Sequence, residues 1–203
     1  MHISEGVLSG PVLLAGAGLA AAGVSLGLKK MDYDRMPRVA MLSAVFFLAS
    51  LVHVPVGPTS VHLVLNGLVG LVLGWAAFPA ILVALSLQAV LFQFGGLTGL
   101  GVNVLDMALP AVAGWYIFGP WVRGHGNGLA WAASFLAGFS ALFMSSLMLA
   151  LALIFTGESF MAAAGTIVAA HLPVMVIEGL LTAACVHFLR KVKPEVLHVA
   201  VTA

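Results

Sequence analysis

The segment Gly128–Phe155 reads GLAWAASFLAGFSALFMSSLMLALALIF and contains no charged residue. A helix needs about 20 consecutive apolar residues to cross a bilayer, and this segment exceeds that length. A second segment, Val39–Val56, approaches it. Strands of a membrane barrel alternate apolar and polar side chains, and neither segment does. Both segments therefore predict membrane-spanning helices.

The composition extends this prediction to the whole chain. Of its 203 residues, 62% are hydrophobic and 7% are charged, and the mean hydropathy is +1.16. Such a chain has too little polar surface for a soluble globule, and its apolar runs are too long for disorder. A net charge of +1 gives no electrostatic footprint for nucleic acid. The lone Cys185 excludes an internal disulfide and paired zinc ligands. We therefore expect an all-α integral membrane protein.

Short loop-like stretches divide the chain into seven apolar segments. They run over Val7–Leu28, Val39–Val56, Val61–Trp75, Phe78–Phe94, Val102–Val122, Leu129–Phe155 and Phe160–Leu189. No repeat or low-complexity linker interrupts them, so residues 1–203 are expected to form a single domain. The third and fourth segments join tightly at AAFP, and their fusion into one helix leaves six crossings as the alternative.

The positive charges predict the orientation. All eight lie in three places: Lys29, Lys30, Arg35 and Arg38 after the first segment, Arg123 after the fifth, and Arg190, Lys191 and Lys193 after the last. Seven crossings put them all on one side, which the positive-inside rule makes cytoplasmic. Six crossings would put Arg123 opposite the others, which favours seven. The expected topology has an outer N-terminus, a cytoplasmic C-terminus and no cleavable signal peptide, because a positive n-region is missing.

This topology gathers three of the seven histidines at the outer face, namely His2, His53 and His62. A single histidine in a membrane segment is ordinarily a buried residue that hydrogen-bonds a neighbour. Several on one side favour a metal or proton site.

The opening MHISEG, residues 1–6, offers a metal chelate. The Met1 amine, the His2 backbone nitrogen and the near ring nitrogen of His2 can bind one ion in succession, through a five-membered and then a six-membered ring. The arrangement is nearly planar, and planar nitrogen coordination indicates copper or nickel, with cobalt plausible. One position stays open, and the topology leaves it to either His62 or His53.

MHISEG closely resembles the start of the substrate-binding membrane components of energy-coupling-factor transporters for cobalt and nickel, the CbiM/NikM family. Three more stretches resemble that family, with the same order and spacing: SVHLVLNGLVGLVLG from Ser60, LFQFGGLTGLGVN from Leu91 and HLPVMVIEGLLTA from His171. The resemblance implies seven transmembrane helices and an outward N-terminus folded back into the membrane. It also implies that Met1, His2 and His62 hold the metal, which selects His62 as the fourth ligand.

The same resemblance implies the biological setting. The chain would capture Co²⁺ or Ni²⁺ in a prokaryotic inner membrane, for cobalamin biosynthesis or for nickel enzymes. A transmembrane coupling subunit, cytoplasmic ATPase subunits and often a small accessory membrane protein would be its partners. The chain itself carries no nucleotide-binding motif: GGLTGLG, residues 95–101, lacks the Lys-Ser/Thr pair of a phosphate loop. We expect a transporter component that is not an enzyme, with this stretch as an outer loop over the metal.

Six further polar residues are expected to support the site: Asn66, His53, Gln93, Asn103, Asp106 and His171. Asn66 follows His62 by four residues, which on a helix places it on the same face, where its amide could orient the imidazole. A plain hydrogen bond from Asn66 to a neighbouring helix is an equal alternative. Gln93 stands where the family often has a histidine or another polar residue before GGLT.

Two acidic residues allow alternative interpretations. Glu5 could add a negative field that attracts a dication or could cap the first helix. Glu178 could be a counter-ion, but a structural role or a partner contact is the preferred interpretation.

Two other functions stay open. One is a membrane component for an organic micronutrient such as a vitamin, which needs no free amine. The other is an intramembrane enzyme that uses His62, His171, Asp106 or Glu178 as acid, base or metal ligand.

Overall fold

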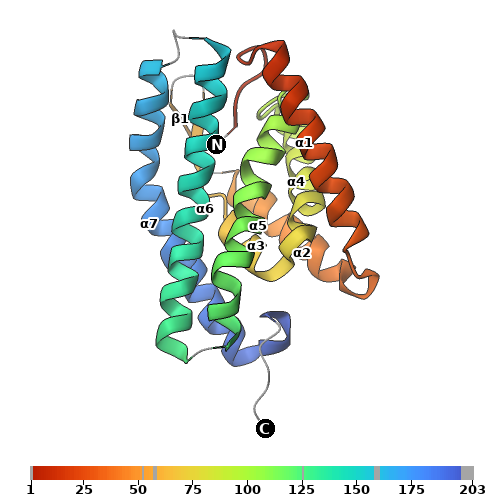
Figure 1. The fold of residues 1–203 in the computed structure, drawn as a ribbon, viewed down its shortest axis with the longest axis vertical. Coiled ribbons are helices and arrows are strands. Elements are labelled where there is room, and N and C mark those ends of the chain that lie inside the picture. The colour runs from red at the N-terminus through yellow and green to blue at the C-terminus, as the bar shows by residue number, and fades with distance from the viewer. Residues whose placement is uncertain (1, 52, 57–58, 125, 158–160, 198–203) are drawn as a thin grey trace.

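Long apolar helices dominate the computed structural model, which describes residues 2–51, 53–56, 59–124, 126–157 and 161–197 (Figure 1). The α-helices are α1 (Gly10–Lys29), α2 (Met36–Ala49), α3 (Asn66–Leu73), α4 (Ala77–Phe92), α5 (Leu100–Gly124), α6 (Asn127–Thr156) and α7 (Met161–Val192). Short 3₁₀ turns are η1 (Tyr33–Arg35), η2 (Gly74–Ala76) and η4 (Pro194–Leu197), and the strands are β1 (His53–Val56) and β2 (Thr59–His62).

Each predicted apolar segment overlaps one α-helix, yet within the described residues five stretches are long and apolar enough to cross a membrane. The helix α2 has 14 residues, which is short for a span. The helices α3 and α4 belong to one apolar stretch, Asn66–Phe92, which is broken at Gly74, where φ is 55°. The structure therefore supports a multi-pass membrane protein, whereas seven crossings remain a prediction.

The expected helical fold is confirmed except between α2 and α3, where β1 and β2 form an antiparallel hairpin with His53 opposite His62. Helix was expected as far as Val56 and again from Val61, and this part of the prediction is wrong. The sequence there, HVPVGPTSVH, is rich in β-branched residues, which favour extended backbone, and its prolines interrupt helical hydrogen bonding. His62 therefore lies on a strand, and the expected helical face shared by His62 and Asn66 does not exist.

The short helix α3 occupies the centre of the helix bundle, packed against α5, α6 and α7. Two glycines permit this packing. A Cβ on Gly70 would lie 2.1 Å from the carbonyl oxygen of Ala111, and one on Gly67 would lie 2.6 Å from the Cα of Gly138. Both contacts are far too short for any side chain, so the buried position of α3 depends on these two residues.

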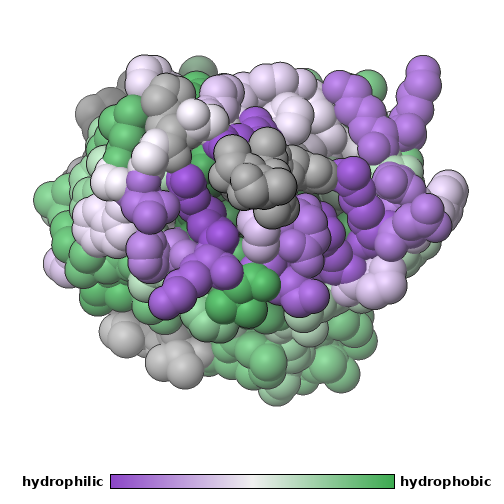
Figure 2. Space-filling model, turned by 90° about the horizontal axis from the view of Figure 1, so that it is seen from below, coloured by the Kyte–Doolittle hydropathy of each residue, from purple (hydrophilic) through white to green (hydrophobic). Residues whose placement is uncertain are grey.

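The cationic side chains gather at the end of the molecule where α1, α5 and α7 finish, the lower end in Figure 1. Figure 2 shows the hydrophilic residues collected on this face. Contacts join the basic segments: Arg38 donates to the carbonyl of Val196 (3.3 Å), and Arg190 donates to that of Val122 (2.8 Å).

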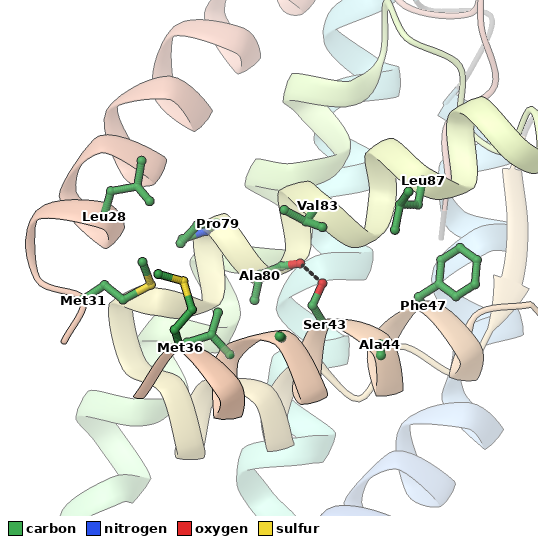
Figure 3. A pocket seen from close by; sticks show the side chains of 12 residues that line it. Leu28, Met31, Met36, Ser43, Ala44, Phe47, Pro79, Ala80, Val83 and Leu87 are labelled. Carbon is green, nitrogen blue, oxygen red and sulfur yellow. Dashed lines mark hydrogen bonds between the residues drawn. The ribbon is translucent and has the colours of Figure 1, made fainter. Parts of the chain in front are cut away.

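An apolar groove of about 410 Å³ opens between the end of α1, α2 and α4 (Figure 3). Its lining includes Met31, Met36 and Phe47, and its polar side chain Ser43 donates to the carbonyl of Ala80 (2.8 Å). Among the described residues that line it, none is a histidine or an acidic residue. The groove therefore lacks the nitrogen and carboxylate ligands that a divalent ion needs.

Candidate metal centre

The structure brings His2 and His62 into direct contact, although 60 residues separate them. The Nδ1 atom of His2 lies 3.0 Å from Nε2 of His62, and the ring centroids are 4.7 Å apart. Both side chains are buried, with exposed fractions of 5% and 3%. Nδ1 is the near ring nitrogen of His2, the one that closes the six-membered chelate ring, so the second imidazole lies on the side where an ion would be held.

Gln88 on α4 fixes the orientation of the His2 ring. Its Oε1 lies 2.7 Å from Nε2 of His2, while its Nε2 donates to the carbonyl of Phe47 (3.2 Å) and to the Ser50 hydroxyl. Because the Phe47 carbonyl can only accept, the amide has one orientation, and Oε1 must accept a proton from His2 Nε2. This tautomer leaves the lone pair of His2 on Nδ1, the ring nitrogen that the predicted chelate would use.

His62 is oriented in the same way from its other side. Its Nδ1 lies 2.8 Å from the carbonyl oxygen of Leu63, which can only accept a hydrogen bond, so Nδ1 carries the proton and Nε2 the lone pair. With both rings neutral, two lone pairs face each other across 3.0 Å. Such a pair repels unless a proton or a metal cation is shared.

The spacing of these nitrogens suits neighbouring positions around one ion. Imidazole nitrogens lie about 2.0 Å from a bound divalent metal such as zinc, so two of them at a right angle are about 2.8 Å apart. The observed separation of 3.0 Å is close to that value. The two rings therefore need little movement to bind the same ion.

Burial also keeps the His62 imidazole in its neutral form. Loss of water around the ring lowers the pKa of His62 well below 6.5. A neutral imidazole is the form that binds metal, so His62 needs no deprotonation at neutral pH.

Asn103 on α5 anchors the backbone that follows His2. Its Oδ1 accepts from the Ile3 N–H (3.0 Å), and its Nδ2 donates to the Ile3 carbonyl (3.4 Å). Gly95 lies against the other side of His2, where a Cβ would be 3.2 Å from the ring. Its φ of 76° also favours glycine. His2 and Ile3 are thereby held in the interior of the protein.

Glu5 joins the opening segment to the glycine-rich loop. Its carboxylate accepts from the Thr98 N–H (3.3 Å) and lies against Gly96. The helix α1 begins only at Gly10, with no acidic residue in its first turn. Of the two interpretations of Glu5, the helix cap is therefore wrong, and its carboxylate instead contacts the glycine-rich loop at Thr98 and Gly96.

The other expected supporting residues are distributed differently. Asn66 donates to the Met107 carbonyl and the Ser145 hydroxyl, both at 3.1 Å, which joins α3 to α5 and α6. His171 is buried, and its Nδ1 lies 2.7 Å from the Ile167 carbonyl. Asp106 is buried, and its carboxylate has no hydrogen-bond partner within the described residues.

Gln93 is exposed at the end of α4, where it adopts a φ of 57°. The glutamine that contacts His2 is instead Gln88, which was not among the expected residues although a polar residue inside an apolar segment is a visible signal. Met1 and the side chain of His53 lie outside the described residues.

Comparison with known proteins identifies the family. The sequence pattern of the CbiM family, described as the cobalt uptake substrate-specific transmembrane region, matches residues 2–196. The chain belongs to the CbiM family. A putative metal transport protein of Haemophilus influenzae is 41% identical over 209 residues, which cover 98% of this chain and 97% of that protein.

Other relatives extend the likeness to nickel and to solved structures. The fused nickel transport protein NikMN of Rhodobacter capsulatus is 39% identical over 122 residues, which cover 56% of this chain and 35% of that protein. The crystal structure of a transition metal transporter has a TM-score of 0.83 and 26% identity, covering 98% of this chain and 96% of that one. The family resemblance noted in the sequence is thus confirmed, and the relatives are transport proteins.

Proposed function

We propose that this chain is the substrate-binding membrane component of an energy-coupling-factor importer, and that it captures Ni²⁺ or Co²⁺ for ATP-driven uptake. The Met1 amine, the His2 backbone nitrogen, His2 Nδ1 and His62 Nε2 would bind the ion. The observation that carries the proposal is the approach of His2 Nδ1 to His62 Nε2, 3.0 Å apart in a buried site with both tautomers set for metal binding.

The donor set suits Ni²⁺ and Cu²⁺, admits Co²⁺ and disfavours Zn²⁺. Four nitrogens in a plane suit Ni²⁺ and Cu²⁺, and an amide nitrogen loses its proton to these ions far more readily than to Zn²⁺. Cu²⁺ would bind at least as tightly by the usual affinity order. Selectivity in the cell would then reflect metal availability or the transport step.

The transport cycle needs partners. No segment of the chain carries a nucleotide-binding motif, so a coupling subunit and cytoplasmic ATPases would drive release, in some systems with a small accessory membrane protein. The cationic end formed by α1, α5 and α7 would face the cytoplasm. The opening segment would face outward, in a prokaryotic inner membrane.

The pH dependence of Ni²⁺ binding tests this chemistry. Protons compete with the ion, so affinity must rise with pH. The amine, with an ordinary pKa of about 7.7–8.0, and the His2 amide each release one proton, so the affinity should fall about 100-fold between pH 7 and pH 6. Equilibrium dialysis of the purified protein against Ni²⁺ at pH 6, 7 and 8 measures it.

The variant His62→Ala separates the contribution of His62 to Ni²⁺ binding from the contribution of the amine and the amide. Because burial lowers the pKa of His62 well below 6.5, His62 is already neutral over this range. His62→Ala should therefore bind more weakly with the same slope against pH. A wild-type affinity that stays flat between pH 8 and pH 6 would contradict a chelate that includes the amine and the amide.

A further inference from the structure

The backbone between His62 and α3 has an unusual support. Residues 63–65 belong to no helix or strand, and Leu65 has a φ of 56°, a left-handed conformation that a leucine rarely adopts. Val64 is fully buried. Buried N–H groups outside regular structure need an acceptor from elsewhere, most strictly within a membrane.

Glu178 on α7 supplies that acceptor. Its Oε1 accepts from the N–H groups of both Val64 and Leu65, and its Oε2 accepts from Leu65 at 2.9 Å. The carboxylate is completely buried. One side chain from a residue 113 positions away in the sequence therefore satisfies the two N–H groups that follow directly after the His62–Leu63 pair.

These contacts connect to the proposed metal ligand through the backbone. The Leu63 carbonyl that orients the His62 ring belongs to the peptide unit whose N–H, that of Val64, is held by Glu178. Movement of this peptide plane would change the carbonyl and the N–H together, because the unit is rigid. The position of His62 Nε2 thus depends on the carboxylate of α7.

We propose that Glu178 is a positioning residue for the metal centre: it holds the 63–65 backbone so that His62 Nε2 faces His2 Nδ1. This inference rests on the proposed function. Glu178 does not bind the ion in this scheme, and it acts only through His62.

Two substitutions of Glu178 test the proposal, and they remove one or both of its acceptor oxygens. In Glu178→Gln the amide oxygen replaces Oε1, but the NH₂ group faces the Leu65 N–H, so one acceptor is lost. Glu178→Ala removes both acceptor oxygens. We expect the Ni²⁺ dissociation constant to rise about 10-fold in the first and about 100-fold in the second, the range typical of residues that support metal ligands.

Thr182→Val is the matched control. Thr182 is buried one turn further along the same face of α7, and its hydroxyl has no hydrogen-bond partner among the described residues. The substitution keeps the shape of the side chain and should leave Ni²⁺ affinity unchanged. If Glu178→Ala does not fold, the nearly isosteric Glu178→Gln carries the test.

A double-mutant cycle with His62→Ala distinguishes positioning from general stabilisation. In the His62→Ala background, Glu178→Gln should change the dissociation constant less than about two-fold, because the group it positions is gone. The electron paramagnetic resonance spectrum of Cu²⁺ bound to Glu178→Ala should resemble that of His62→Ala rather than the wild type.

Three outcomes would be decisive. Wild-type affinity in Glu178→Gln, or an equal loss with and without His62, would overturn the role of Glu178 and leave the proposed function intact. Failure of the wild-type protein to bind Ni²⁺ in the same dialysis would overturn both.

Discussion

Two extra residues placed before Met1 are expected to abolish the retention of Ni²⁺ or Co²⁺. The extension converts the α-amine into an ordinary amide and removes the donor that starts the proposed chelate. It also adds bulk where the chain start is buried: Ile3 is 1% exposed, and Gly95 packs against His2. We expect the affinity to fall at least about 1,000-fold, or about 4 kcal/mol.

The length of the extension matters for this experiment. A single added residue would create a new amine, two amides and the imidazole in succession, which could itself bind Ni²⁺ in a plane. Two residues avoid this chelate. The same two residues appended after Ala203 serve as the control and should leave metal content unchanged. Mass spectrometry after gel filtration measures the metal content. If the protein with the N-terminal extension still holds stoichiometric metal, the role of the amine is refuted.

His62→Ala is expected to weaken Ni²⁺ binding about 100-fold, or about 2.7 kcal/mol. The substitution removes the one proposed ligand outside the opening dipeptide, whose Nε2 lies 3.0 Å from Nδ1 of His2. The three remaining nitrogens still form a chelate, so the loss should be smaller than with the N-terminal extension. Isothermal titration with Ni²⁺ measures the difference.

His53→Ala is the natural comparison, because topology alone made the two histidines equal candidates. Its backbone lies opposite that of His62 in the hairpin. The family resemblance assigns the metal to His62, so His53→Ala should lower the affinity less than about three-fold, well under the loss expected for a ligand. Equal losses in the two variants would mean that the fourth ligand is assigned wrongly.

The positions of His2 and His62 illustrate how much the sequence could predict. Alternating apolar segments and loops predicted the helices, and coordination chemistry alone made His2 a ligand candidate. Composition and chelate-ring size are local properties, so they are readable from one chain. The approach of His62 to His2 is a tertiary contact, and only the resemblance to a known family favoured it over His53.

The residues that orient these two histidines could not be predicted in the same way. Gln93 was expected to support the site because of its place before GGLT, but it is exposed at the left-handed end of α4, and Gln88 contacts His2 instead. Helix ends of this kind depend on packing with the following loop. Glu178 acts on backbone N–H groups that are free only because Thr59–His62 is a strand rather than a helix.

The hairpin itself shows the limit of reading apolar runs in a membrane protein. Within lipid a helix is the default, because it satisfies every backbone group internally. The strands β1 and β2 depart from that default because they pair with each other, at β-branched positions interrupted by proline. The hydropathy of a segment does not indicate whether it pairs as a strand or forms a helix.

The magnetic susceptibility of the Ni²⁺ complex tests the central claim most directly. In a planar field of four nitrogens that includes a deprotonated amide, the d⁸ ion pairs its electrons, so the purified one-to-one complex should be diamagnetic, with an NMR spectrum free of paramagnetic shifts. A paramagnetic complex would show that the ion is not held in a plane of four nitrogens, and that the N-terminal chelate closed by His62 is not the binding site.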